Sequence, residues 1–319
     1  MVVASSVWFN SQLGPGKLSK EKYLYFDKSM SRKQVVQRLV DADVIANYRA
    51  FDLYAQYKSA LQSVKPGMYK FVPNMTVDQV IASLNSPIRQ MVRLPEGWWI
   101  ARTAKRLEEN KVCTAQEYID LANDAEKFRK ANPWLPKQAK TLEGFLYPDT
   151  YDLPPTLGAE RVINLQLATF KKRVLEPEKN FFDLYKIVTI ASMVELEAKL
   201  DSERPMVSGV IHNRVNKSMR LEIDATVLYA LQEWKVLGPG IVGTVDSPYN
   251  TYRNSGLPPG PIGSPSQKSI QAAMNPQKHG YLYYVAKGDL SGGHLFAPTY
   301  SQHLANIRIA RRMKPPEQN

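Results

Sequence analysis

Two glutamates, Glu195 and Glu197, lie in a segment that is otherwise almost entirely apolar. Residues 184–200 contain no Gly or Pro, which favours a helix, and apolar side chains fall on nearly every side of that helix. Such a helix is buried, and an unpaired carboxylate there is costly to ionise, so its pKa rises. Because a carboxyl group that stays protonated near neutral pH can act as a general acid, both glutamates are candidates for acid/base chemistry.

The two carboxylates lie on different sides of the predicted helix. With 3.6 residues per turn, Glu195 and Glu197 are separated by about 160°, so they do not share one cleft. One of them can be catalytic while the other is structural. The alternative is that each is only ion-paired, Glu195 with Lys199 four residues further on.

Short elements follow this helix and must position its side chains. Residues 202–215 predict a second helix, residues 219–224 alternate like a short strand, and residues 226–231 predict a further helix. The segment 256–265 is rich in Gly and Pro, so it is stiff and suits the wall of a cleft. A strand, a Gly-rich turn, a second strand and a helix complete an α+β pattern over residues 281–312.

The N-terminal third repeats a pattern of strand, turn and helix. Phe26, Val35 and Leu39 recur 45 residues later as Phe71, Val80 and Leu84. The turns carry Ser31 and Thr76 in the N-cap position, and a third unit follows over residues 90–110. So few copies do not form a solenoid, and the repeat predicts a small α+β module, which is either a polymer-binding module or a spacer.

The chain as a whole is basic. It has 319 residues, with 42 Lys and Arg against 30 Asp and Glu, and a formal net charge of +12. This length suffices for two domains, and 44% hydrophobic residues exclude a disordered chain. The charge either serves solubility alone or points to a polyanionic partner, which can be nucleic acid, an anionic membrane surface or an acidic polymer.

The sequence offers little for metal or disulfide chemistry. Cys113 is the single cysteine, which excludes an intramolecular disulfide, and the four histidines show no zinc-binding spacing. We therefore expect neither a metal nor a cofactor. The apolar start of the chain is far shorter than the roughly 20 residues of a spanning helix. We interpret residues 1–21 as the remnant of a membrane anchor and linker, with a frayed terminus or a first strand as the alternatives.

A series of motifs runs in order along the chain. They are Leu94-Pro95-Glu96-Gly97-Trp98, Glu143-Gly144-Phe145-Leu146-Tyr147-Pro148-Asp149-Thr150-Tyr151, Val194-Glu195-Leu196-Glu197, Ser202-Glu203-Arg204, Asn213-Arg214, Met219-Arg220-Leu221, Asp224-Ala225-Thr226, Tyr249-Asn250-Thr251-Tyr252, Gly256-Leu257-Pro258-Pro259-Gly260 and Gly293-His294-Leu295-Phe296. In type, order and spacing, over roughly residues 22–312, these motifs resemble the endolytic murein transglycosylases, the MltG or YceG-like family. The departures are mild, such as Leu196 where members usually have Lys.

The resemblance implies an activity and a place in the cell. It implies lytic cleavage of the β-1,4 bond between N-acetylmuramic acid and N-acetylglucosamine in nascent peptidoglycan strands, which leaves a 1,6-anhydro end and terminates strand elongation. It implies that the first glutamate of the Val-Glu-x-Glu motif, Glu195, is catalytic. It also implies a LysM-like N-terminal module and an anchor in the bacterial inner membrane, with the enzyme on the extracytoplasmic, periplasmic face.

These implications set the expected domains and partners. We expect a LysM-like α+β module at residues 22–135 and an α+β catalytic domain with a buried catalytic helix at residues 136–319. The expected partners are peptidoglycan glycan strands, cell-wall synthases and, through the N-terminus, the membrane surface. Nucleic acid is not among them.

The lytic reaction suits a single carboxyl group. Hydrolases of sugars normally need two carboxylates, but in the lytic reaction the 6-hydroxyl of the muramic acid is the nucleophile. Glu195 can therefore protonate the leaving oxygen and then accept the hydroxyl proton. The residues expected to line the cleft or to orient the substrate are Glu143, Arg220, Asp224, Tyr249, Asn250 and Tyr252.

Two other functions remain compatible with the sequence. A muramidase-type hydrolase needs a second carboxylate that faces Glu195, such as Glu143 or Asp224. A catalytically silent, glycan-binding scaffold of the cell-wall machinery needs Glu195 only as an ion-pair partner.

Overall fold

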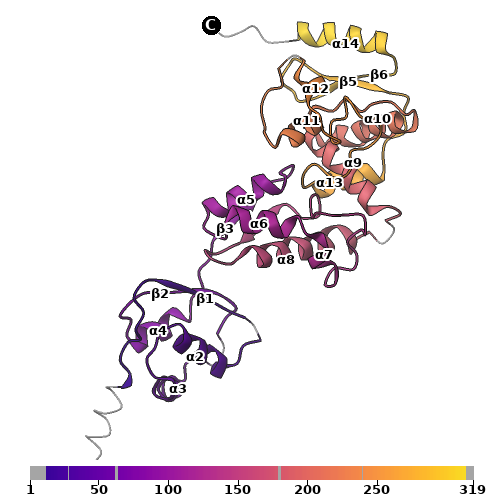
Figure 1. Ribbon diagram of the computed structural model, residues 1–319. Coiled ribbons are helices and arrows are strands. Elements are labelled where there is room, and N and C mark those ends of the chain that lie inside the picture. The colour runs from indigo at the N-terminus through magenta and orange to yellow at the C-terminus, as the bar shows by residue number, and fades with distance from the viewer. Residues whose placement is uncertain (1–11, 28, 62–63, 179–180, 239, 314–319) are drawn as a thin grey trace, which may run out of the picture. The chain divides into compact units, whose positions relative to one another are not determined.

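A computed structural model describes residues 12–313, apart from residues 28, 62–63, 179–180 and 239 (Figure 1). The chain divides into two compact units. The first consists of Met1–Val92, Asn110–Cys113 and Tyr151–Gly158, and the second of Arg93–Glu109, Thr114–Thr150 and Ala159–Asn319. Both units combine helices with short strands, so the predicted α+β class is confirmed. The domain boundary predicted near residue 135 falls inside the second unit.

The first unit is built around one antiparallel pair of strands, β1 and β2, in which Lys22 lies opposite Phe71. Its elements follow in the order β1 (Lys22–Phe26), α2 (Arg32–Asp41), α3 (Tyr48–Tyr57), β2 (Gly67–Phe71) and α4 (Val77–Ser83). Phe26, Phe51 and Phe71 are buried in its apolar core.

The predicted repeat is present in this unit, because each of its strands is followed by a turn and a capped helix. The Ser31 side chain accepts a hydrogen bond from the backbone of Gln34, and Thr76 accepts one from Gln79, each within a capping box. Since the first N–H groups of a helix have no partner within it, these caps fix where α2 and α4 begin.

The second unit carries the segments that the sequence singled out. Strands β3 (Met91–Leu94) and β4 (Asp149–Asp152) pair with each other, and the unit boundaries fall within both. The other elements are, in order, α5 (Ile100–Glu109), α6 (Ala115–Ala122), α7 (Ala125–Arg129), α8 (Ala159–Phe170), a π-helical turn (Lys171–Leu175), α9 (Leu184–Glu197), a 3-10 turn (Asp201–Glu203), α10 (Arg204–Asn216), α11 (Asp224–Leu231), α12 (Ile241–Thr244), α13 (Gln267–Met274), β5 (Tyr283–Ala286), β6 (His294–Ala297) and α14 (Tyr300–Arg312).

Helix α9 is the buried helix that the sequence predicted. Its residues from Val188 to Val194 are all buried, and it packs against α10 and α13. Strands β5 and β6 pair antiparallel, with Tyr284 opposite Phe296, and α14 packs on this pair (Figure 1). Both strands and the last helix were predicted at these positions.

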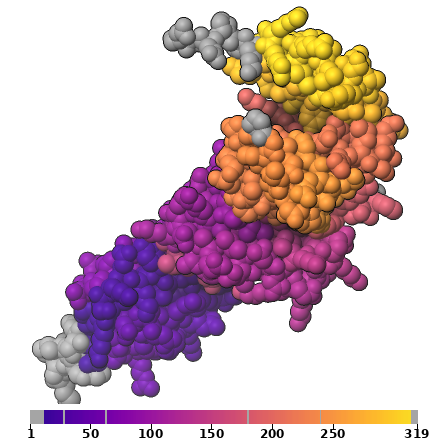
Figure 2. All heavy atoms as spheres, turned by 45° about the horizontal axis from the view of Figure 1, so that its top comes forward, coloured from indigo at the N-terminus to yellow at the C-terminus, as the bar shows by residue number. Residues whose placement is uncertain are grey.

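Segments that are distant in the sequence lie side by side in the second unit, where its orange part meets its magenta part (Figure 2). The turn before α5 exchanges two backbone hydrogen bonds with the proline-rich segment, from Gly97 to Ser264 at 2.8 Å and from Ser264 to Trp98 at 2.9 Å. Gly97 has a φ of +72°, and a Cβ added to it would lie 2.8 Å from Leu196 Cδ2. Glycine therefore lets this turn pack directly on the helix that carries the glutamates.

The strand predicted over residues 219–224 is wrong. In the described part of the chain this segment forms no ladder, and Arg220 makes one isolated bridge with Ser255. Glu222 adopts a left-handed φ of 52°, which interrupts the extended run, and α11 already begins at Asp224.

The predicted anchor remnant lies mostly outside the described residues, which begin at residue 12. Within the residues that are described, no helix combines the length and the apolar character that a membrane span requires.

Candidate active site

Helix α9 directs its two glutamates into different surroundings, as the sequence predicted. The carboxylate of Glu195 is held on both oxygens: Oε2 accepts hydrogen bonds from the backbone N of Ser266 at 2.8 Å and from its hydroxyl at 2.5 Å. Arg204 Nη2 lies 3.3 Å from Oε1, and both side chains are about nine-tenths buried. An ion pair for Glu195 therefore exists, but with Arg204 of α10 and not with Lys199.

This ion pair belongs to a network that joins three elements. Ser266 is the N-cap of α13, Arg204 begins α10, and Arg204 also donates to Asp201 and to Ser269. The carboxylate of Glu195 thus fixes the start of α13 relative to α9 and α10.

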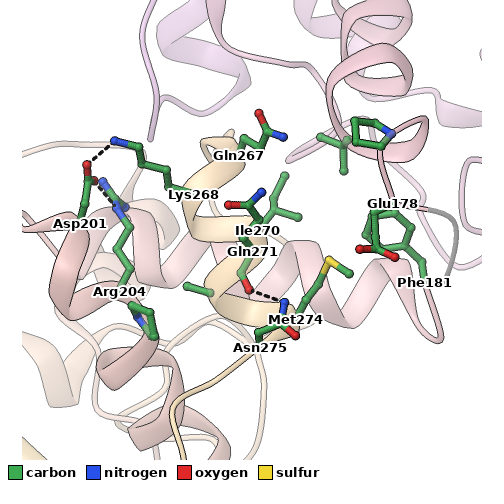
Figure 3. A pocket seen from close by; sticks show the side chains of 14 residues that line it. Glu178, Phe181, Asp201, Arg204, Gln267, Lys268, Ile270, Gln271, Met274 and Asn275 are labelled. Atoms are coloured by element: carbon green, nitrogen blue, oxygen red, sulfur yellow. Dashed lines mark hydrogen bonds and ion pairs between the residues drawn. The ribbon is translucent and has the colours of Figure 1, made fainter.

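A cavity of about 490 Å³ opens beside this network (Figure 3). Figure 3 shows Lys268 and Arg204 both directed at Asp201, with Gln267 and Gln271 along the face of α13. Neither glutamate of α9 lines this cavity. Within this cavity the carboxylate of Asp201 is paired with both Arg204 and Lys268.

Glu197 faces a second cavity, of about 350 Å³, on the other side of α9. The hydroxyl of Tyr284 donates a hydrogen bond to Oε2 at 2.9 Å. Burial raises the pKa of Glu197, the bond from Tyr284 lowers it and the nearby charge of Asp224 raises it, with a net pKa of about 7. Glu197 is therefore a carboxyl group that is half protonated near neutral pH and that opens onto a cavity.

Two of the predicted supporting residues share this cavity with Glu197. Asp224 begins α11, and Tyr252 donates a hydrogen bond from its hydroxyl to Asp224 Oδ1 at 2.6 Å. The remaining lining residues are Arg214, Leu221, Glu222, Tyr284, Val285, His303 and Ile307. The cavity thus combines carboxyl groups with phenolic hydroxyls, the polar groups that bind sugar hydroxyls.

Arg220 contributes to this region through its backbone. Its carbonyl accepts a hydrogen bond from Arg214 Nη1 at 3.0 Å, while its exposed side chain does not line the cavity. Arg214 also donates to the carbonyls of Leu221 and Leu282, and its side chain is nearly buried. Arg214 therefore holds the segment before α11 against β5.

The structure places Glu143, Tyr249 and Asn250 away from the cavity of Glu197. Glu143 is buried, and its Oε2 accepts hydrogen bonds from the backbone N of Ile100 at 3.1 Å and from the Tyr229 hydroxyl at 3.4 Å. Burial raises the pKa of Glu143 to about 8, so it is neutral at pH 7. Tyr249 packs its ring on Tyr229, and the fully buried Asn250 donates to two backbone carbonyls. These contacts organise the loop before the proline-rich segment.

Sequence reasoning missed Tyr284, which is 87 residues from Glu197 along the chain. Its ring packs edge-on against His294, and His294 Nδ1 lies 2.7 Å from Glu203 Oε2. The alternation of strand β5 was the available signal, because it turns Tyr283 and Tyr284 to opposite faces. This alternation does not reveal which face of β5 lies against α9. In the part of the chain that the structure describes, no group of His, Cys, Asp and Glu side chains is arranged to hold a metal ion.

Comparisons with known proteins identify the family of this chain. The model of the YceG-like family matches residues 24–309, so the chain belongs to the YceG-like family, and the predicted family is confirmed. An "endolytic murein transglycosylase" of Bacillus subtilis is 31% identical over 284 residues, which cover 82% of this chain and 77% of that protein.

Two further proteins extend the comparison. A Streptococcus pneumoniae protein with the same name is 29% identical over 86% of this chain, and the chain spans 56% of its length. The crystal structure of a putative yceG-like protein from Listeria monocytogenes is 32% identical and superposes with a TM-score of 0.59 over 90% of this chain and 99% of that one.

Proposed function

We propose that this chain is a lytic transglycosylase of peptidoglycan in which Glu197 transfers the proton. The enzyme class follows from the family and from the names of its relatives. The observation that carries the assignment of Glu197 is its place on an open cavity with a pKa of about 7.

The surroundings of Glu195 argue against the role predicted for it. A guanidinium and two hydrogen-bond donors occupy its oxygens, and all of them belong to the network that joins α9, α10 and α13. A proton donor must reach the substrate oxygen, and this carboxylate is enclosed by protein. Glu195 is therefore structural in this proposal, and Glu197 takes the acid/base role.

The chemistry requires one carboxyl group in two protonation states. Glu197 donates its proton to the glycosidic oxygen as the C1–O bond of the muramic acid breaks, which frees the N-acetylglucosamine hydroxyl. The 6-hydroxyl oxygen of the same muramic acid then bonds to C1, and its proton returns to Glu197. The product is a 1,6-anhydro end, no water is consumed, and the enzyme is regenerated. Burial favours the protonated form of Glu197, and the negative charge of Asp224 adds to this effect.

The position of Asp224 is also compatible with one alternative function, a muramidase-type hydrolase. Asp224 is a second carboxylate in the same cavity as Glu197, which is what a muramidase-type hydrolase requires. Mass spectrometry of digested peptidoglycan separates the two reactions, because an anhydro end is lighter than a hydrolysed end by one water molecule. If only hydrolysed ends are found, the lytic reaction is refuted and the hydrolase is the function.

The remaining parts of the proposal concern the rest of the protein. The order strand, helix, helix, strand in β1, α2, α3 and β2 supports a LysM-like, glycan-binding role for the first unit. The resemblance to the family supports action within nascent strands, termination of their elongation, cell-wall synthases as partners, contact with the membrane surface and a periplasmic location. A wall polymer bearing carboxylates also suits the net charge of +12.

The two glutamates of α9 provide a matched experiment. We expect Glu197→Gln to lower the release of anhydro ends from uncrosslinked glycan by about 10²- to 10⁴-fold with unchanged thermal stability, because a general acid is lost from an open cavity. Glu195→Gln should have a lower melting temperature than the wild type. At temperatures where it is folded, it should still release anhydro ends. If instead Glu195→Gln is folded and inactive while Glu197→Gln is active, the assignment is reversed. If both variants are folded and active, neither glutamate transfers the proton. A wild-type protein that releases no anhydro ends favours the scaffold role with ion-paired glutamates.

A further inference from the structure

A cluster of indole and guanidinium groups lies at the start of α5, outside both cavities described above. The guanidinium carbon of Arg102 is 4.8 Å from the ring centre of Trp98, 5.2 Å from that of Trp99 and 5.7 Å from that of Trp234. Arg106, one turn further along α5, lies 4.9 Å from the ring centre of Trp98. We call Trp98, Arg102, Arg106 and Trp234 the Trp–Arg cluster.

The members of this cluster differ in exposure. Trp99 lies beneath it and is 1% exposed, so it belongs to the core, whereas Trp234 is 52% exposed. Trp98 and Arg102 are half-buried. A half-exposed indole is costly to leave in water, and indoles are enriched where a surface binds a partner.

Arg102 also lacks the partner that other enclosed arginines of this unit have. Arg204 and Arg214 each pair with a carboxylate, but among the described residues no carboxylate lies within ion-pair distance of Arg102. Its charge is held in place by aromatic faces alone. The N–H groups of its planar guanidinium can bind a carboxylate through two parallel hydrogen bonds.

Helix α11 connects the cluster to the cavity of Glu197. Asp224 at its first residue lines that cavity, and Tyr229 near its other end packs edge-on against Trp99. The two positions are five residues apart, which is about 7.5 Å along the helix axis. Trp234 follows shortly after α11 ends at Leu231.

We propose that the Trp–Arg cluster is an accessory subsite for a carboxylate-bearing glycan strand, at a distance from the bond that is cleaved. The exposed indole of Trp234 stacks on the apolar face of a pyranose ring, and Arg102 binds a carboxylate of the lactyl group or the stem peptide. This inference rests on the proposed action on peptidoglycan and adds to it a second contact between the enzyme and the strand. The occupant is a glycan because the cluster combines a surface that stacks on a sugar ring with a cation that binds a carboxylate. A peptidoglycan strand carries both of these groups.

The test measures binding separately from turnover. In a Glu197→Gln background, the Kd of soluble, uncrosslinked glycan strands is measured by calorimetry for Trp234→Ala and for Arg102→Gln. We expect each to weaken binding about tenfold, and the effect of Arg102→Gln to vanish on strands whose carboxyl groups have been amidated. Phe182→Ala, a fully exposed aromatic residue, and Lys137→Gln, an exposed cation, are the matched controls and should bind as the background does.

Two further measurements decide the remaining outcomes. If Trp234→Ala and Arg102→Gln bind glycan as the background does, the subsite is refuted, and this holds even if they bind phosphatidylglycerol vesicles more weakly, which identifies a lipid site. Since Arg102 packs against three indoles, Arg102→Lys is a second variant that keeps the charge and should weaken binding less than Arg102→Gln. The proposed function fails separately, when the wild-type protein releases no anhydro ends from the same strands.

Discussion

Burial raises the pKa of Glu197, and two neighbours then act on it in opposite directions, so substitution of each neighbour should move the pH profile oppositely. The bond from Tyr284 stabilises the ionised carboxylate, and the charge of Asp224 destabilises it. Tyr284→Phe should therefore raise the pKa, and Asp224→Asn should lower it. Because Glu197 must be protonated to act as the acid, the rate falls as the pH rises through this pKa.

The sizes of the two shifts follow from the structure. A hydrogen bond to a charged group contributes about 1.5–3 kcal/mol, and one pKa unit corresponds to about 1.4 kcal/mol, so Tyr284→Phe should move the alkaline limb up by about 1–2 units from near pH 7. Asp224 is exposed, which screens its charge, and we expect Asp224→Asn to move the limb down by about half a unit. The measurement is kcat/KM for release of anhydro ends between pH 5 and 9, roughly spanning both values, because this ratio reports the free enzyme.

The neighbouring residue of the same strand supplies the control. Tyr283→Phe is the same substitution on the opposite face of β5 and should leave the limb in place. Only the pH at which kcat/KM falls is compared. The maximal value of kcat/KM is not compared, because Asp224→Asn removes a group from the cavity and can change that value by itself. If the limb stays fixed in both variants, or moves the same way in both, Glu197 is not the group that titrates.

Three further predictions concern stability. Glu195→Gln should lower the free energy of unfolding by about 3 kcal/mol, measured by urea denaturation at pH 7, because it leaves the buried guanidinium of Arg204 short of a partner; an unchanged midpoint would show that the network is dispensable. Glu143 keeps its proton up to about pH 8 when the protein is folded and releases it near pH 4.5 when the protein is unfolded. As the pH rises from 5 to 8, the wild type should therefore lose about 3.5 kcal/mol of unfolding free energy relative to Glu143→Gln, and a constant difference would contradict the raised pKa. Gly97→Ala should cost about 1–2 kcal/mol, because of its positive φ and the contact of the new Cβ with Leu196, and a melting temperature equal to that of the wild type would contradict this reasoning.

The sequence was informative wherever the deciding interactions are local. The caps at Ser31 and Thr76 act within one helical turn, and the repeat of strand and helix followed from them. The apolar composition of α9 predicts its burial, and the separation of its two glutamates follows from 3.6 residues per turn. The strand predicted at residues 219–224 failed because alternation alone does not reveal the left-handed residue that interrupts it.

The sequence by itself determined the family, the α+β class and the buried helix that carries both glutamates, since these rest on local patterns and on motifs in order. Only the tertiary structure decided which glutamate opens onto a cavity and which is enclosed. Glu195 meets Ser266, which is 71 residues away, and Glu197 meets Tyr284, which is 87 residues away. The reason is physical: the pKa and the accessibility of a carboxyl group depend on burial and on its partners in space, and neither is encoded within a few residues of the group itself.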